Sequence, residues 1–545
     1  MTQNGILYLR RLTVLLTVTF TPITTMVHAG PASTEFYFPS TGVSVPKQAL
    51  LLGIDDYLLP LRENVGTYLS TPTYRREPVL SPTKEDPNAP DSVASHFYGG
   101  VVERNGKYQM WYYAVGLSEL GDTYKPVVKN LHPGPVCYAE STDGIHWTKP
   151  NLGQLEIHGS KDNNAIALPD TQIEGVHVML DESDPDPNRR YKMVYNPHNG
   201  KTWVIRTATS ADGIHWKAAD DFGIDQFLET AGVYKFNDLF VVNGQRITFS
   251  DGGHLSGRQG RAIISTDFDH WLPGDTGAFL LDEPANPEDR GHTKPYDQVH
   301  LGVGAQSFGN VVVGFYGLWH NAPGDEDSQK RWGWFGYGKI SCDLGLVISN
   351  DGLHFREPDK GRAYISRLDT PATPMPGKNY PTVLTQSGNG ILNVGDQTLI
   401  YFGRWLNAEY NQGYRGEVAM ATLPRDRWGA LGLYPAKARG EEPMTSGSVW
   451  SAPVTLPSAG CEVYLNADYA DHLTVEISDA KFQLLKDYSG EQSGSSAQPS
   501  GLDCAVAFPQ GDLSALGGQT VRFKIKFTRE GEANPRLFAV TLRTH

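Results

Sequence analysis

Ser141-Thr142-Asp143-Gly144-Ile145-His146-Trp147 is the stretch that decides the fold, because the chain repeats it. Three further copies keep the frame: SADGIHW at 210–216, STDFDHW at 265–271 and SNDGLHF at 349–355. A degenerate fifth copy at 421–428 retains the Asp and the terminal Trp but lacks the Gly. Intervals of roughly 55 to 85 residues are too long for a helical solenoid and are typical of propeller blades with variable insertions.

The motif also has a local physical meaning. Asp-Gly combines an Asx-type side-chain bond with a residue free to take positive φ, which predicts a tight turn between antiparallel strands. The aromatic residue after the turn is a large apolar anchor that we expect to pack between neighbouring sheets. Repetition at equivalent places marks a scaffold element, so the functional residues are expected elsewhere.

Each copy closes a unit of three β-type segments. In the first unit the segments are 95–103, 108–113 and 136–140, and Asn105-Gly106 forms the first turn. Five such units predict a five-bladed β-propeller over residues 30–435. After about Tyr434 the repeat stops, and alternating segments predict a separate β-sandwich over residues 436–545. The predicted fold class is therefore all-β.

Composition supports this fold class and limits the partners. The 545 residues include 58 Gly and 36 Pro with 11% aromatics, which favours a turn-dense β protein. A formal charge of −14 argues against a nucleic-acid partner, which needs a basic face. A neutral or weakly charged ligand fits better, and the sequence leaves the oligomeric state open.

Residues 1–29 have the features of a secretory signal. Arg10 and Arg11 precede a short apolar run, and Val27-His28-Ala29 approximates a small-residue cleavage site. No later stretch approaches the roughly 20 apolar residues of a membrane span. We therefore expect a secreted or periplasmic protein.

Four cysteines are compatible with an oxidising compartment. Cys461 and Cys504 lie in the same C-terminal region and could pair. Cys137 and Cys342 fall in predicted strands, where buried free thiols are expected.

The first strand of each predicted blade leads toward the central channel, so residues at the leading ends of these strands should meet in one pocket. Glu174, Glu229 and Asp297 occupy such positions in three consecutive units. A trio of carboxylates suits glycosyl transfer, because one acid protonates the leaving oxygen, another is nucleophile or base, and a third orients the sugar.

Polar and aromatic residues near these ends are candidates for sugar binding. Imidazole and amide groups can hydrogen-bond hydroxyls, and Tyr or Trp rings, including Trp405, can stack on a sugar face. Asp56, which with Asp55 interrupts an apolar run, is either a capping residue or part of the site. The candidate substrate-binding residues are His96, His177, Gln298, His300, Asp56, Tyr98, Trp319 and Arg404.

The repeated Ser-x-Asp-Gly-x-His-Trp pattern with carboxylates at the strand ends resembles the five-bladed propeller glycoside hydrolases of families 32 and 43. The resemblance covers 53–433 and implies that Glu229 is the general acid and Glu174 the transition-state stabiliser. Asp55, Asp56, Asp91 or Asp297 would then be the nucleophile or base, and His96 or His177 is an alternative proton donor. The Trp-x-Asn-Asp-Pro-Asn-Gly, Arg-Asp-Pro and Glu-Cys signatures of fructosidases are absent, which leaves the sugar and the stereochemical outcome open.

Several of the same residues have side chains that can bind a metal ion. His96, His177, His254, His300 and Asp297 could assemble a site, and the resemblance makes a Ca²⁺ ion in the channel conceivable. No compact ligand spacing such as His-Glu-x-x-His is present, so no cofactor is predicted.

The sequence thus predicts a secreted glycoside hydrolase. The alternatives are a non-catalytic propeller that binds a glycan or a protein, and phosphorolysis or elimination on the same class of sugar.

Overall fold

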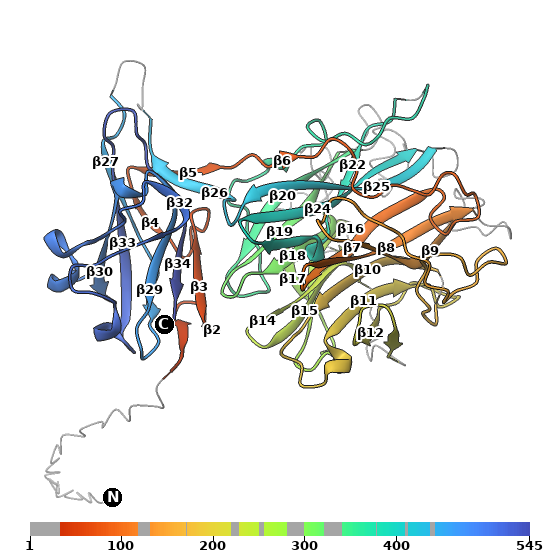
Figure 1. Ribbon diagram of the computed structural model, residues 1–545, viewed down its shortest axis with the longest axis horizontal. Coiled ribbons are helices and arrows are strands. Elements are labelled where there is room, and N and C mark those ends of the chain that lie inside the picture. The colour runs from red at the N-terminus through yellow and green to blue at the C-terminus, as the bar shows by residue number, and fades with distance from the viewer. Residues whose placement is uncertain are drawn as a thin grey trace, which may run out of the picture.

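The computed structural model describes residues 33–117, 131–170, 172–219, 228–249, 255–280, 299–320, 341–377, 379–408, 413–435 and 442–544. The chain in these ranges is all-β, with strands joined by turns and short 3-10 helices and without an α-helix (Figure 1). None of these elements is a helix able to cross a bilayer. The predicted secretion signal, residues 1–29, lies outside the described residues.

Two repeat units form separate four-stranded antiparallel sheets in which the strands follow chain order. The first sheet comprises β10 (Ile173–Leu180), β11 (Tyr191–Pro197), β12 (Arg206–Ser210) and β13 (Trp216–Ala218). The second comprises β14 (Glu229–Phe236), β15 (Leu239–Phe249), β16 (Leu255–Ser265) and β17 (Thr276–Phe279).

The other units join in one curled twelve-stranded sheet. It contains β18 (Val299–Ser307), β19 (Val312–His320), β20 (Ser341–Ser349), β21 (Ala363–Ile365), β22 (Val383–Thr385), β23 (Ile391–Val394), β24 (Gln397–Ala408), β25 (Gly413–Pro424), β6 (Thr73–Tyr74), β7 (Ala94–Arg104), β8 (Lys107–Leu117) and β9 (Leu131–Ser141). Strand β25 pairs with β6 and with β7, so the end of the repeated region lies against its beginning.

The first strands of successive units lie side by side. β7 packs against β10, β10 against β14 and β14 against β18, and all four contact the short 3-10 helix η3 (Gly388–Gly390). At Gly388 an added Cβ would lie 2.3 Å from the carbonyl oxygen of Ala305, so only glycine permits this approach. These strands form the centre of the repeated region.

The repeated motif forms the predicted turn. In the second copy Ser210 pairs with Trp216 across it, and Asp212 accepts hydrogen bonds from the backbone N–H groups of Ile214 and His215, both at 2.8 Å. Gly213 has φ +79°, the left-handed conformation that favours glycine. The motif is therefore a rigid hairpin end, as the sequence indicated.

The motif also links neighbouring sheets. Trp111 Nε1 donates to the carbonyl of Gly213, Tyr234 Oη to that of Gly352, and Tyr401 Oη to that of Gly144, each at 2.7 Å. The last of these bonds joins strand β24 to the turn after β9, at opposite ends of the repeated region. We call these three contacts the inter-sheet hydrogen bonds.

Two further sheets pack face to face as a sandwich (Figure 1). The C-terminal part contributes β26 (Gly429–Leu433), β27 (Ser446–Trp450), β28 (Val454–Thr455), β29 (Glu462–Asp468), β30 (Leu473–Asp479), β31 (Gly494–Ser495), β32 (Ser500–Ala505), β33 (Thr520–Thr528) and β34 (Arg536–Arg543). The N-terminal part contributes β1 (Glu35–Phe38), β2 (Val43–Pro46), β3 (Gln48–Leu52), β4 (Leu61–Glu63) and β5 (Val65–Leu69).

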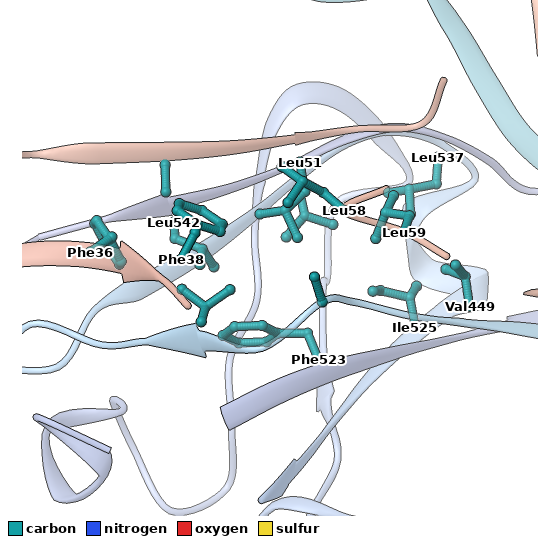
Figure 2. Packing of buried hydrophobic residues seen from close by; sticks show 14 of the residues in the cluster. Phe36, Phe38, Leu51, Leu58, Leu59, Val449, Phe523, Ile525, Leu537 and Leu542 are labelled. Atoms are coloured by element: carbon teal, nitrogen blue, oxygen red, sulfur yellow. The ribbon is translucent and has the colours of Figure 1, made fainter. Parts of the chain in front are cut away.

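The predicted boundary at 435/436 therefore does not separate the sheets. β1 pairs with β28, β3 with β34, β4 with β27 and β5 with β26, so both ends of the chain build the sandwich. Figure 2 shows Phe36, Phe38 and Leu51 from the N-terminal strands packed with Phe523 and Leu542 from the C-terminal ones. Burial of each such side chain contributes about 1.5–3 kcal/mol, which favours this long-range pairing.

The predicted pairing of Cys461 with Cys504 is wrong. All four cysteines are buried free thiols. Cys504 lies opposite Leu465 in the β29–β32 pair, four residues beyond Cys461. That offset is roughly 13 Å along an extended strand, whereas a disulfide requires Cα atoms within about 7 Å.

Candidate active site

The four inner strands β7, β10, β14 and β18 each carry a register irregularity near their leading ends. The shifts fall between His96 and Gly100, Ile173 and Val176, Thr230 and Gly232, and His300 and Val303. A β-bulge turns a side chain away from the regular alternation of a strand, and bulges are enriched beside active sites. Here they place four predicted site residues, His96, Glu174, Glu229 and His300, next to a local change in strand direction.

Glu174 and Glu229 form the centre of the site. Both are partly buried, on the neighbouring strands β10 and β14. Burial raises the pKa of Glu174 well above its ordinary value, the charge of Glu229 raises it further, and the Arg258 guanidinium acts in the opposite direction. Glu174 therefore keeps its proton to a higher pH than an ordinary glutamic acid.

Glu229 has a different environment. Its Oε2 accepts a hydrogen bond of 2.5 Å from Nε2 of Gln245, the residue directly opposite it on β15. Gln245 is buried, and its Oε1 accepts a bond of 2.6 Å from the backbone N–H of Leu301 on β18. The two carboxyl groups thus lie close enough to interact but differ in their partners.

Buried imidazole and aromatic rings form a second cluster, and Arg258 links it to the acid pair because its charge acts on both Glu174 and His300. The His96 ring lies 4.6 Å from Tyr98, 4.6 Å from Tyr113 and 5.2 Å from Trp405 between centroids. The His300 ring lies 4.6 Å from Trp319, over which the Arg258 guanidinium sits at 5.6 Å. Tyr98 connects the two groups at 6.5 Å from His300.

The two histidines are held neutral. Burial lowers the pKa of His96 to about 3. Burial also lowers the pKa of His300 well below its ordinary value, and the charge of Arg258 acts in the same direction. Near neutral pH both rings are therefore in the neutral imidazole form, which disfavours His96 as the alternative general acid.

His177 lies within the inner-strand packing. Its Nε2 donates to the carbonyl oxygen of Thr230 at 2.9 Å, and its Nδ1 lies 3.2 Å from Ser387 Oγ. Burial lowers its pKa to about 4, although the bond to Thr230 acts to raise it. His177 therefore joins β10 to β14 and to the segment before η3, and it too is unsuited to donate a proton near neutral pH.

Asp56 lies away from the acid pair. It is 62% exposed and pairs with Arg356 Nε at 2.7 Å, while the adjacent Asp55 is buried against the same guanidinium at 2.6 Å. Asp55 also caps the backbone N–H groups of Tyr57 and Leu58. The capping interpretation of this pair therefore holds, and the site interpretation does not.

Asp91, another candidate for the nucleophile, is also engaged elsewhere. It is fully buried and accepts from Ser95 Oγ at 2.7 Å, from Tyr112 Oη at 2.9 Å and from Lys149 Nζ at 2.5 Å. These contacts account for its burial as part of a structural ion pair.

Arg404 faces the wrong way for the predicted role. Its Nε pairs with Glu417 at 2.9 Å, and its terminal nitrogen donates to the carbonyls of Arg76 and Pro371 at 2.9 and 3.0 Å. Neighbouring residues of a strand point to opposite faces, and it is Trp405 that contacts His96.

Asp297, Gln298 and His254 lie outside the described residues, so their predicted roles stay predictions. Across the described ranges, no group of three or more His, Cys, Asp or Glu side chains is arranged to hold a metal ion.

Sequence reasoning missed Arg258 and Gln245. Gln245 lies on the second strand of its unit and Arg258 on the third, whereas the residues predicted from the repeat lie at the leading ends of the first strands. Gln245 lies directly opposite Glu229, so a polar residue opposite a candidate acid was the available signal. Arg258 lies opposite Ile247 and gave no such signal.

The chain shows limited similarity to known proteins. No protein-family model matches the chain. An uncharacterised protein of Mycobacterium tuberculosis strain H37Rv is 29% identical over 179 residues, which are 32% of this chain and 50% of that protein. The chain thus spans about half the length of the curated relatives it matches.

Among solved structures, a glycosyl hydrolase from Bacteroides ovatus is 15% identical, with 66% of this chain and 95% of that chain covered at a TM-score of 0.41. The β-1,2-mannobiose phosphorylase from Listeria innocua is 13% identical, with 66% and 97% covered at a TM-score of 0.40. A structure described with the family 130 mannoside phosphorylases is 14% identical, with 66% and 95% covered at 0.41. Family 130 differs from families 32 and 43, whose resemblance is not confirmed.

Proposed function

We propose that the protein is a carbohydrate-active enzyme that hydrolyses glycosidic bonds at the Glu174–Glu229 pair of a five-bladed β-propeller. The propeller interpretation rests on the five repeat units, on the side-by-side packing of their first strands around η3, and on the closing pair β25–β6. The catalytic proposal is carried by two neighbouring carboxyl groups with different surroundings: burial and the charge of Glu229 raise the pKa of Glu174, whereas Glu229 accepts a hydrogen bond from Gln245.

The roles of the two acids follow from their surroundings. Glu174 is the general acid, because burial and the neighbouring charge keep it protonated, and it gives its proton to the leaving glycosidic oxygen. Glu229 acts as the carboxylate that attacks the anomeric carbon or takes a proton from water. This assignment differs from the one that the resemblance to families 32 and 43 implied. The general acid is Glu174 in place of Glu229, and Glu229 takes the role of nucleophile or base.

A panel of oligosaccharides tests the proposal with Glu174→Gln, Glu229→Gln and the control Glu103→Gln. Glu103 lies near the other end of β7, where its carboxylate accepts from the N–H of Gly106. Loss of a positioned acid or base should reduce turnover by about 10²- to 10⁴-fold in the first two variants and leave the control unchanged. Wild-type turnover by Glu174→Gln would remove that residue from the mechanism, and glycan binding without turnover by any form would favour the binding module.

Phosphorolysis is the second candidate, because the Arg258 guanidinium acts on both Glu174 and His300 and is a suitable group to hold a phosphate. Adding inorganic phosphate to the same assay separates the two reactions. A phosphorylase releases a sugar 1-phosphate and needs phosphate for turnover, whereas a hydrolase releases the free sugar at the same rate without it.

Secretion remains a prediction from residues 1–29. We further propose that the sandwich supports the repeated region. The cluster that joins Leu50, Leu52 and Ala539 of the sandwich to Val311 and Val313 supports this role.

A further inference from the structure

We propose that Gln245 is a positioning residue that fixes the orientation of Glu229 for catalysis, and that the bulge at Leu301–Gly302 in turn fixes the orientation of Gln245. This inference rests on the proposed function, because it assigns Glu229 to the reaction. It adds a residue from the second strand of the unit and a backbone device from the neighbouring unit.

The contact between the two side chains is fully specified by the strands. Gln245 and Glu229 are direct partners in the β14–β15 register, and Gln245 is 2% exposed. Its amide nitrogen donates to Oε2 of Glu229 at 2.5 Å. A buried amide in this position holds the carboxyl group in one rotamer.

The orientation of the amide follows from its second bond. The backbone N–H of Leu301 can only donate, so the group that lies 2.6 Å from it must be the amide oxygen of Gln245. The NH₂ group must then face Glu229. Because this nitrogen can only donate, Oε2 of Glu229 is held as an acceptor, which suits a nucleophile or base.

The Leu301 N–H reaches Gln245 only because β18 is irregular there. Leu301 has φ +59°, rare for a leucine, and Gly302 has φ +69°. A Cβ on Gly302 would lie 1.9 Å from the carbonyl oxygen of Gly244, so this position requires glycine. Strain of this kind persists where the surroundings determine it, and it is enriched at functional sites.

A second amide holds the bulge from the opposite side. Nε2 of Gln386 donates to the carbonyl of His300 at 2.6 Å and to that of Gly302 at 3.0 Å. The chain of contacts therefore runs from Gln386 through the Leu301–Gly302 bulge to Gln245 and then to Glu229.

The test compares Gln245→Leu, Gln245→Glu and the control Gln109→Leu, measuring kcat and KM against pH. Gln109 is also a buried glutamine, and it hydrogen-bonds Tyr191 and Tyr138 far from the acid pair. We expect Gln245→Leu to lower kcat by about 10- to 100-fold with KM within a factor of two, because misplacement of a reacting group by a fraction of an ångström has this cost. Gln109→Leu should leave kcat unchanged.

The Gln245→Glu variant, which is close in shape to the wild type, distinguishes a loss of Glu229 orientation from a general loss of folding. The carboxyl introduced by Gln245→Glu can donate a hydrogen bond only when it is protonated, so kcat should recover toward acid pH in this variant and not in Gln245→Leu. A wild-type kcat in Gln245→Leu would overturn the proposal, as would parallel pH profiles for both variants.

A second readout does not require turnover. In protein labelled with ¹³C at the glutamate carboxyl carbons, the Glu229 signal is identified by its loss in Glu229→Gln. We expect Gln245→Leu, and not Gln109→Leu, to move this signal. If no glycan is turned over by the wild type, the proposed function fails while this measurement still decides the contact, and an unmoved signal refutes it.

Discussion

Tyr401→Phe and Tyr234→Phe remove the same hydroxyl group from two inter-sheet hydrogen bonds, yet the structure predicts different costs. In both cases a buried tyrosine donates at 2.7 Å to the glycine carbonyl of a repeated turn. In the first pair, Gly144 O also accepts from Trp147 Nε1 at 3.0 Å, so the carbonyl keeps one donor after the substitution. The cost should then be that of an ordinary hydrogen bond, about 1 kcal/mol.

The second pair leaves more groups unsatisfied. The fourth copy of the motif ends in Phe355, whose side chain has no N–H, and the described residues offer Gly352 O no other donor. Tyr234 Oη also accepts from Asn243 Nδ2 at 3.1 Å, so Tyr234→Phe leaves a buried carbonyl and a buried amide without this partner. With a cost of about 1–3 kcal/mol for each of these two groups, the total is roughly 2–6 kcal/mol.

Urea unfolding followed by tryptophan fluorescence measures both free energies of unfolding. Tyr464→Phe is the matched control, because this hydroxyl bonds Glu462 on the surface and its loss should change stability by less than about 0.5 kcal/mol. Equal costs for Tyr234→Phe and Tyr401→Phe, or a larger cost for Tyr401→Phe, would refute the reasoning that the second donor at Gly144 compensates. No effect from Tyr401→Phe would argue against closure between the first and last units.

Three further predictions concern titrating groups. Burial acts to raise the pKa of Asp212, but hydrogen bonds from His215 and Ile214 lower it to about 2. The carboxylate therefore stabilises the fold above about pH 4, and this stabilisation is lost as the pH falls toward 2. In urea unfolding, Asp212→Asn should be less stable than the wild type at pH 6 and should approach it at pH 3. Because the pKa of His177 is lowered to about 4, the free energy of unfolding should fall as the pH decreases from 6.5 to 4. His177→Gln should reduce this dependence on pH even if it lowers stability at every pH. An unchanged dependence would contradict the burial of a neutral imidazole. In Glu229→Gln the pKa of Glu174 should fall, since one cause of its elevation is the neighbouring charge, and a ¹³C titration in which it does not move would exclude the coupling.

Local sequence patterns predicted the repeat and part of the site, because the turn motif depends only on residues that are neighbours in the sequence. Asp-Gly turns and their aromatic anchors need only neighbouring residues, and the rule that first strands lead to a common centre brought Glu174 and Glu229 together. The same rule selected Arg404 one residue away from Trp405, and in a strand a shift of one residue moves a side chain to the other face.

Such local patterns do not predict which strands pair when they are distant in the sequence. The short N-terminal strands β1 to β5 have no property that distinguishes a propeller strand from a sandwich strand, and only the apolar surface of the C-terminal sheets decides where they pack. The sequence also did not predict the bulge at Leu301–Gly302, because His300-Leu301-Gly302 is typical strand sequence and the irregularity appears only in the register with the partner strand.

The two acids show why position alone does not assign chemistry. In the sequence, Glu174 and Glu229 are equivalent carboxylates at equivalent places, and analogy by unit number gave the proton to Glu229. Their surroundings break this equivalence. Glu174 is desolvated beside a charge of the same sign, while Glu229 accepts a bond from an amide nitrogen that can only donate. Each environment is built by residues of other strands, so the division of roles belongs to the fold and would be lost if Gln245 or the bulge behind it were moved.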